Sequence, residues 1–308
     1  MKFTSREVRQ KFLDFMASKG HAILPTSSLV PKEDPTVLFN TAGMQPLVPY
    51  LMGQPHPEGT RLANSQKCFR TNDIEEVGDN RHLTYFEMLG SWSLGDYFKT
   101  ESIEWGFEFL TGKQWLSLDP NRLFVTVYKG NSDVPEDDIA IDAWKKQFAT
   151  LGIDAEVGTE FDFKNPENND DPNTFIYRIS KRSGKDNWWG LPYKGPCGPC
   201  TEIYYLLDRN PVDFQESVLP TLSLQQVDDF LENEVVEIWN HVFMQFIGEK
   251  DDQKEPINLS AMEKKNIDTG MGLERLLAVL NGYDSVYKTD ALKPIVDVVE
   301  KYSVGVKS

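Results

Sequence analysis

Two arginines stand where a phosphate group could be held. Arg70 ends a segment with strand character, SQKCFR, and Arg275 lies one turn into the amphipathic segment that follows DTGMG. Arginine carries a rigid fork of N–H donors that matches the oxygens of a phosphate. The sequence contains neither G-x-G-x-x-G nor G-x-x-x-x-G-K-[ST], so a nucleotide would have to be bound by arginines on a sheet. Taken singly, each arginine is also consistent with an ordinary surface residue.

Two apolar side chains accompany the first arginine. In HLTYFEML, strand alternation places Thr84, Phe86 and Met88 on one face. Beside Arg70, the ring could stack on a nucleotide base and the methionine could close a pocket. The alternative is a plain hydrophobic sheet face, which this strand by itself favours.

The segment before Arg275 combines an acidic residue with two glycines. Gly270 and Gly272 lie where a strand passes into a helix, and glycine there allows either a close backbone approach or a tight turn. Asp268, two residues upstream, could bind an ammonium group. It could equally cap the turn or the start of the helix, where an acidic side chain is favourable.

The cysteines and histidines form no metal-binding or nucleophilic pattern. Cys197 and Cys200 are a C-x-x-C pair in GPCGPC, but no second pair stands at zinc-finger spacing, and Cys68 is remote in sequence. The flanking prolines favour a tight structural loop. The four histidines are isolated from any nucleophile or ligand partner: His21, His56, His82 and His241. We therefore predict no zinc site and no catalytic triad.

The first predicted secondary-structure element is an amphipathic helix. A Thr4–Glu7 capping box starts it and Gly20 stops it. Its buried stripe is Val8, Phe12, Phe15 and Met16. Strands within 65–70 and 82–98 flank a polar loop and predict an antiparallel hairpin.

The remaining elements follow in a mixed order. Helical spacing occurs over 103–110 and 139–151, and 122–128 is a buried strand. The inner side of the second helix is predicted to carry Ile139, Ala143, Trp144 and Phe148. EVVEIWNHVFMQF is a strand or a helix, and NIDTGMGLERLLAVLNG is a short strand, a glycine turn and a helix. This order does not alternate strand and helix, so it predicts an α+β fold with a mostly antiparallel sheet.

Charge limits the kinds of partner that the chain can attract. The 308 residues include 32 Lys plus Arg and 48 Asp plus Glu, a formal charge of −16, so any nucleic-acid contact requires a local basic patch. The densest one is RISKRSGK, with Arg178, Lys181, Arg182 and Lys185, although such runs are often solvated faces. The stretch 160–173 is a polar, acidic loop. No apolar run reaches membrane-spanning length, and three cysteines suit a reducing cytoplasm.

Together the motifs resemble the catalytic domain of alanyl-tRNA synthetases, which are class II aminoacyl-tRNA synthetases. They are SQKCFR, TYFEMLGSWSLGDYFK, GPCGPCTEI, EIWNHVFMQF and IDTGMGLERL, in the family's order, and NTAGMQPL resembles its motif 1 region. The resemblance runs from about residue 3 to about residue 300 and implies an antiparallel sheet flanked by helices. It also implies that alanine and MgATP give alanyl-adenylate and pyrophosphate, and that the alanyl group then moves to the 3′ end of tRNA(Ala).

The resemblance implies a role for each matching residue. Arg70 would bind the α-phosphate and the alanine carboxylate, Arg275 the adenine and γ-phosphate, and Phe86 the other adenine face. Asp268 would hold the alanine ammonium, with Asn240 nearby. The remaining implied residues are Met88, Trp189 and Val242 as walls of the methyl pocket, Gly270 as its floor, and Glu237 as a Mg²⁺ ligand.

The hairpin loop departs from the family pattern. After Arg70 the family commonly runs through Gly-Gly-Lys-His before Asn-Asp, whereas here Thr71 leads directly to Asn72 and Asp73. ATP affinity or tRNA engagement would then be altered. Alternatively Arg81, His82 or the basic run from Arg178 to Lys185 would substitute in binding pyrophosphate or the tRNA end.

The chain is also short for the family. Residues 1–282 correspond to the catalytic domain, and 283–308 to at most the start of the helical tRNA-recognition region. The chain would be a cut, small or split form, with tRNA-recognition and editing domains supplied in trans. Two alternatives remain: a paralogue that charges an acceptor other than tRNA, and a non-catalytic tRNA- or partner-binding module. The full set of Arg70, Asp268 and Arg275 argues against the second.

Overall fold

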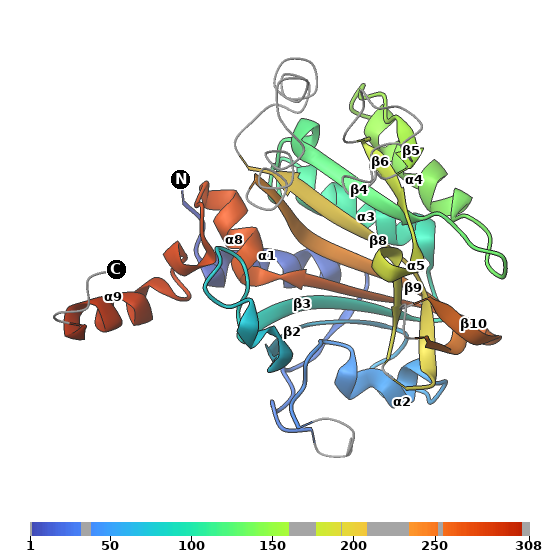
Figure 1. The fold of residues 1–308 in the computed structure, drawn as a ribbon, viewed down its shortest axis with the longest axis horizontal. Coiled ribbons are helices and arrows are strands. Elements are labelled where there is room, and N and C mark those ends of the chain that lie inside the picture. The colour runs from blue at the N-terminus through green and yellow to red at the C-terminus, as the bar shows by residue number, and fades with distance from the viewer. Residues whose placement is uncertain are drawn as a thin grey trace.

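A large mixed sheet is the centre of the molecule (Figure 1). The computed structural model describes residues 2–31, 38–159, 177–191, 193–207, 234–251 and 255–303. The strands are β1 (Ala22–Ile23), β2 (Arg61–Phe69), β3 (Tyr85–Leu94), β4 (Leu123–Tyr128), β5 (Val157–Thr159), β6 (Ile179–Arg182), β7 (Trp188–Gly190), β8 (Gly195–Leu206), β9 (Val235–Lys250) and β10 (Pro256–Gly272). Their order in the sheet is β1-β2-β3-β10-β9-β8-β4-β6-β5, and β7 pairs with β8.

The middle of the sheet is antiparallel throughout. The pairs from β2 to β4 along that order are antiparallel. Parallel pairs occur between β1 and β2, β4 and β6, and β5 and β6, near the two ends. The predicted α+β class with a mostly antiparallel sheet is confirmed.

Helices supply the second layer. They are α1 (Ser5–Ser18), α2 (Val48–Leu51), α3 (Lys99–Thr111), α4 (Asp138–Ala149), α5 (Gly184–Asn187), α8 (Leu273–Asn281) and α9 (Lys293–Tyr302), with 3₁₀ turns over Gln45–Leu47, Asn72–Glu75, Pro120–Arg122 and Val286–Lys288. The main core joins α1, α3, α4 and α8 to one face of the sheet, for example through Phe12, Phe109, Trp239 and Leu276. On the opposite face a smaller core cluster packs Met44, Leu47 and Leu51 against Trp92, Val242 and Met244. The cavity described below shares Met44 and Val242 with this cluster. Figure 1 shows α9 projecting from the body, and no residue of α9 is buried.

The first helix and the hairpin confirm their predictions. Thr4 and Glu7 form the capping box of α1, whose four predicted core residues are buried. Gly20 follows the helix with φ of +84°, a conformation that favours glycine. β2 and β3 pair in antiparallel register, with Cys68 opposite Phe86.

Two local predictions were wrong. Ile139 lies in the first turn of α4 and is 57% exposed, because the buried side of that helix is formed by its neighbours Ala140 and Ile141. GPCGPC is part of strand β8 and not a tight loop. A Cβ on Gly198 would lie 2.0 Å from the carbonyl oxygen of Phe243, so glycine lets β8 approach β9 closely, and a register shift between Cys197 and Cys200 absorbs the irregularity.

Other predictions need adjustment or fall outside the described residues. EVVEIWNHVFMQF is a strand, β9, whose residues are buried on both faces at its centre. β10 is long and not the short predicted strand, and its pairing with β9 places Pro256 opposite Lys250. The loop predicted over 160–173 lies outside the described residues.

Candidate active site

The register of the central strands brings residues that are remote in sequence into rows on the open sheet face. Residues opposite each other on neighbouring strands share a face, so each row crosses several strands. One row contains Trp92, Asp268, Val242 and Cys200. The next contains Gly90, Gly270, Asn240 and Glu202. At the two glycines of the second row neighbouring side chains lie directly over the backbone, since a Cβ would be 2.5 Å from Trp92 at Gly90 and 2.8 Å from Met88 at Gly270.

A cavity of about 330 Å³ lies on this face. All the residues that the sequence analysis assigned to ATP and alanine line it: Arg70, Phe86, Met88, Trp189, Glu237, Asn240, Val242, Asp268, Gly270 and Arg275. Residues that it did not assign there also line it, namely Ala42, Met44, Arg81, His82, Leu83, Glu202, Ile238, Gly272 and Glu274. One cavity therefore unites the two arginines with a buried carboxylate and an apolar wall.

Arg70 is fixed at one end of its guanidinium. Its Nε donates to the carbonyl oxygen of Thr41 at 2.9 Å, and the guanidinium carbon lies 5.1 Å from the centre of the Phe86 ring. Within the described part of the chain, its Nη atoms make no hydrogen bond. An arginine oriented in this way presents two donor groups to an oxyanion in the cavity.

Arg275 lies across the cavity against a carboxylate. Its Nη1 is 3.2 Å from Oε2 of Glu237 and 3.4 Å from that residue's carbonyl oxygen. Its Nε donates to the carbonyl oxygen of Arg81 at 3.4 Å. These contacts connect α8, β9 and the loop between β2 and β3, and they hold a positive charge and a carboxylate side by side.

Asp268 is a buried carboxyl group that lines the cavity, and no cationic side chain among the described residues pairs with it. It is 7% exposed, and its Oδ1 accepts a hydrogen bond from Nε1 of Trp92 at 2.7 Å. Burial raises the pKa of Asp268 to about 7, and the Trp92 hydrogen bond opposes that rise. A buried carboxyl without a cation is stabilised when a cationic group arrives, which suits an ammonium ligand.

Binding of an ammonium ligand should depend on pH through this group. The raised pKa leaves Asp268 protonated below about pH 7, and a protonated carboxyl cannot pair with an ammonium ion. We expect the affinity for a ligand with a primary ammonium group, measured at a series of pH values, to rise with pH through about 7 and to level off above it. Glu202 and Glu274 also titrate in the cavity, with pKa values raised to about 8 and about 7. If Asp268→Asn keeps the same profile, the dependence belongs to one of those groups.

Glu202 and Asn240 form the polar wall beside Asp268. The hydroxyl of Tyr204 donates to Oε2 of Glu202 at 2.6 Å, and Nδ2 of Asn240 lies 3.5 Å from Oε1. Burial first, and then the charge of Glu237, raise the pKa of Glu202 to about 8. Asn240 Oδ1 is buried and has no hydrogen-bond partner among the described residues, so it offers an acceptor to a ligand.

Met88, Trp189, Val242 and Gly270 line the apolar part of the cavity. Met88 Sδ accepts a hydrogen bond from the backbone N–H of Gly43 at 3.3 Å, which holds the thioether over the sheet. A Cβ on Gly270 would lie 2.8 Å from that sulfur. Glycine at 270 therefore lets Met88 pack directly over the backbone of β10, next to Trp189 and Val242, which also line the cavity.

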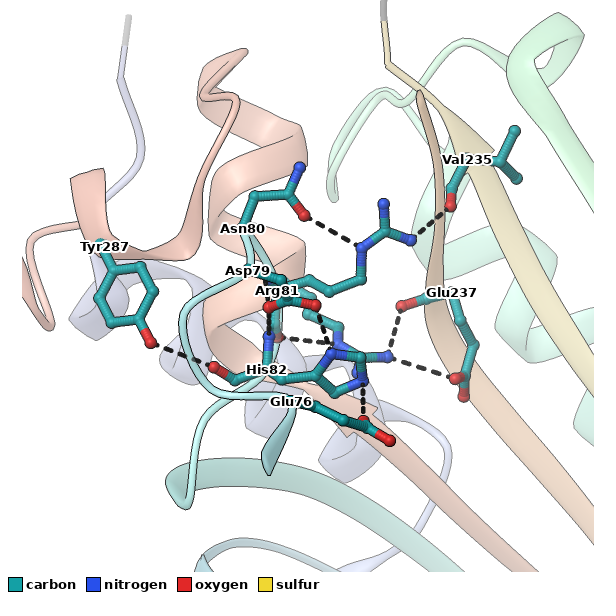
Figure 2. Close-up of polar contacts among 9 residues, drawn as sticks. Glu76, Asp79, Asn80, Arg81, His82, Val235, Glu237 and Tyr287 are labelled. Carbon is teal, nitrogen blue, oxygen red and sulfur yellow. Dashed lines mark hydrogen bonds and ion pairs between the residues drawn. The ribbon is translucent and has the colours of Figure 1, made fainter. Parts of the chain in front are cut away.

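The loop between β2 and β3 brings Arg81 and His82 to the edge of the same cavity (Figure 2). Arg81 Nη1 donates to the carbonyl oxygen of Val235 at 2.9 Å. His82 lies between two carboxylates, with Nδ1 2.5 Å from Asp79 and Nε2 3.1 Å from Glu76. The prediction that these residues substitute for the shortened loop in binding pyrophosphate or the tRNA end stays a prediction.

That loop is also held from the far side. The hydroxyl of Tyr287 donates to the carbonyl oxygen of His82 at 3.2 Å, as Figure 2 shows, and the N–H of Val286 donates to Asn80 at 2.9 Å. Asp290 further accepts from the N–H of Ser5 at 2.9 Å. Residues 283–290 thus pack against the part of the molecule that carries the cavity.

The basic run predicted to contact tRNA is divided among different environments. Arg178 Nη1 donates to the carbonyl oxygens of Asn121 at 2.8 Å and Leu123 at 2.7 Å. Lys181 pairs with Glu136 at 3.0 Å, and the Arg182 guanidinium lies 5.4 Å from the centre of the Tyr204 ring. Lys185 is exposed. These side chains do not line the cavity.

The three cysteines lie in the interior of the protein. Cys68, Cys197 and Cys200 are all buried free thiols. Among the described residues, no three His, Cys, Asp or Glu side chains form a group that could hold a metal ion.

No helix in the described part of the chain is long and apolar enough to cross a membrane.

Sequence reasoning missed Glu202, Glu274 and Trp92. Glu274 lines the cavity and also accepts from the N–H of Glu87 at 3.1 Å. Strand alternation continued from Phe86 and Met88 would have reached Trp92. Glu202 stands two residues after Cys200 in CTEI, but only its register with Asn240 shows that it joins the site.

The fold is a mostly antiparallel sheet flanked by helices, and one cavity on it brings together two arginines and a buried carboxylate. The sequence profile of tRNA synthetases class II (A) matches residues 7–306, so the chain belongs to this family. Curated relatives are the alanine–tRNA ligases of Treponema pallidum, 45% identical over 94% of this chain and 42% of that protein, and of Treponema denticola, 44% identical over 99% and 44%. The chain spans less than half the length of these relatives. Apo histidyl-tRNA synthetase of S. aureus aligns with 98% of this chain and 77% of that one, at 12% identity and a TM-score of 0.46.

Proposed function

We propose that this chain activates L-alanine with ATP to form alanyl-adenylate and pyrophosphate, and that the alanyl group is then transferred to the 3′ end of tRNA(Ala). The observation that carries the proposal is that one cavity contains both Asp268 and Arg70. Among the described residues, the buried Asp268 carboxyl has no cationic partner and the Nη donors of Arg70 make no hydrogen bond. An amino acid bound between them would have its ammonium and its carboxylate recognised at once. The names of the curated relatives support alanine as that amino acid.

The reaction needs orientation and charge stabilisation more than a protein nucleophile. A carboxylate oxygen of alanine attacks the α-phosphorus, a new P–O bond forms, and the bond to the pyrophosphate oxygen breaks. Arg70 would contact the α-phosphate and the alanine carboxylate together, which lowers their mutual repulsion. Phe86 and Arg275 would bind the adenine from its two sides, and Arg275 would also contact the γ-phosphate. Holding the two reactants in line and stabilising the developing charge supply the rate enhancement.

Alanine specificity would come from the opposite end of the cavity. Asp268 would pair with the ammonium group, and the unpartnered Oδ1 of Asn240 would accept a second hydrogen bond from it. Met88, Trp189 and Val242 would surround the methyl group above Gly270. A longer side chain would collide with the methionine, which the Gly43 N–H holds in place.

A magnesium ion fits the donor set on the ATP side. Mg²⁺ is commonly bound by one or two carboxylates together with substrate phosphates and water. Glu237 offers a carboxylate beside Arg275, and its negative charge already raises the pKa of Glu202 nearby. When bound, Mg²⁺ would neutralise phosphate charge; Glu237 would hold it, and Arg275 would then turn its donors to the nucleotide.

We further propose that residues 1–282 form the catalytic unit and that 283–308 begin a helical tRNA-recognition region, with action in the cytoplasm. The acceptor end of tRNA would reach the cavity past Arg81, whereas Arg178, Lys181, Arg182 and Lys185 would contribute through the surface around Lys185. Recognition and editing domains would be supplied beyond this span or in trans.

The proposal is tested by amino-acid-dependent ATP–pyrophosphate exchange with all twenty amino acids and no tRNA. A signal led by alanine is the expected result. Exchange with no amino acid would contradict the proposal and favour a binding module. Robust exchange without transfer to tRNA(Ala), even with the remaining domains added, would indicate a different acceptor.

Glycine and serine should also support exchange, at lower efficiency than alanine. Glycine lacks one methyl and serine adds one hydroxyl, and a small apolar pocket discriminates such differences by only about 1–3 kcal/mol. This corresponds to a loss of about 10- to 200-fold in kcat/KM. Valine and leucine serve as controls that the pocket should exclude sterically. Robust alanine exchange with no detectable glycine or serine exchange would contradict the predicted pocket.

A further inference from the structure

We propose that Trp92 is a positioning residue for amino-acid activation, whose indole N–H orients the Asp268 carboxylate toward the substrate ammonium. This inference rests on the proposed function, because it assumes that Asp268 receives that ammonium. It assigns a role to a residue that does not line the cavity itself.

The contact between the two residues is direct and buried. Trp92 on β3 and Asp268 on β10 are cross-strand partners in register, and Trp92 is 0% exposed. Nε1 of Trp92 donates to Oδ1 of Asp268 at 2.7 Å. A hydrogen bond to a charged acceptor in a water-excluded site is stronger than a neutral one. Within the described part of the chain, this is the hydrogen bond that fixes the Asp268 side chain.

The backbone around the indole is shaped to hold it in this orientation. A Cβ on Gly90 would lie 2.5 Å from the indole ring, and one on Gly43 would lie 3.0 Å from it. The ring therefore occupies the space that a side chain at 90 would take, and the loop at Gly43 covers it. Any larger residue at either position would push the indole away from Asp268.

The division of the carboxylate oxygens follows from this geometry. Oδ1 is occupied by the indole N–H, so the carboxylate cannot rotate freely and Oδ2 remains for the ammonium group. Phenylalanine at 92 would fill much of the same space, but it has no donor. The carboxylate would then lose its orientation and one stabilising contact, while the ATP end of the cavity would keep its residues.

Trp239 provides a matched control on the neighbouring strand β9. It is also 0% exposed, but it packs on the helix-covered face, with its ring centre 6.0 Å from that of Phe12. Its Nε1 has no hydrogen-bond partner among the described residues. Trp239→Phe therefore removes the same atoms from the core without removing a contact to Asp268.

The experiment compares ATP–pyrophosphate exchange by the wild-type chain, W92F and W239F, with circular dichroism to verify folding. We expect the alanine KM of W92F to rise by about 10- to 100-fold, the loss expected for one hydrogen bond to a charged group. Its KM for ATP should stay within about twofold of wild type, and W239F should keep both constants. L-Alaninol, which keeps the ammonium and lacks the carboxylate, should weaken as an inhibitor of W92F in parallel with alanine.

The outcomes separate this inference from the proposed function. If the KM for alanine is the same in W92F and W239F, the role of Trp92 is overturned and the proposed function is left intact. No exchange by the wild-type chain would overturn the proposed function and this role with it. If W92F does not fold, 3-benzothienylalanine at position 92 replaces the N–H by sulfur with little change in shape. The same rise in alanine KM is expected from it, and a wild-type alanine KM would overturn the proposal.

Discussion

Replacing Arg70 by alanine is expected to lower alanine-dependent ATP–pyrophosphate exchange by about a thousandfold, close to complete loss. The guanidinium is held by Thr41 and Phe86 with its remaining donors open to the cavity, where the α-phosphate and the attacking carboxylate would meet. Without it, two anionic groups would approach each other with no charge between them. Initial exchange rates at saturating alanine and ATP measure the effect.

Two further variants make the Arg70 result specific. Arg70→Lys keeps the positive charge but loses the fork of donors, so it should recover only part of the rate. Arg6→Ala removes an exposed arginine from α1 and should leave exchange unchanged. A wild-type rate for Arg70→Ala would show that this arginine does not act on the reacting groups.

Replacing Asp268 should affect alanine far more than ATP. In Asp268→Asn the side-chain volume is kept, and its oxygen can still accept from Trp92, but the negative charge that would face the ammonium is lost. Removing one partner of a buried charge pair typically costs enough to weaken binding by about 100-fold or more. We therefore expect an increase of that size in the alanine KM, with the ATP KM within about twofold of wild type.

The comparison of the two substrates decides the role of Asp268. Titrating alanine at saturating ATP and ATP at saturating alanine gives both constants from one assay. Asp268→Ala should raise the alanine KM further, because the indole N–H of Trp92 then loses its acceptor as well. Equal increases in both constants would indicate a general disturbance of the sheet and contradict the ammonium-binding role.

Local patterns predicted those parts of the fold that depend on neighbouring residues. The capping box and apolar stripe of α1, the hairpin of β2 and β3, and the strand over residues 123–128 all follow from spacing within one segment. The residues assigned through the family's motifs also meet in one cavity. They do so because those motifs lie on the strands that the register aligns.

What could not be predicted depends on contacts between distant segments. GPCGPC reads as a loop because proline and glycine are rare in central strands, and only the close approach of Gly198 to Phe243 explains its place in β8. Glu202 joins the site through its register with Asn240, and Trp92 through its register with Asp268. Neither alignment can be derived from spacing within one strand, since a shift of one residue would reverse the faces.

The burial of the three cysteines makes the native protein a poor target for oxidants and thiol reagents. Burial raises the pKa of Cys68 to about 12 and that of Cys197 to about 11, so almost no reactive thiolate forms at neutral pH. Cys68 and Cys200 lie on the strands that carry the cavity. A thiol reagent can therefore modify them only when the sheet opens, and the rate of labelling then reports the rate of that opening. A ligand that binds only the closed sheet should lower the labelling rate, so occupancy of the cavity can be followed without measuring turnover.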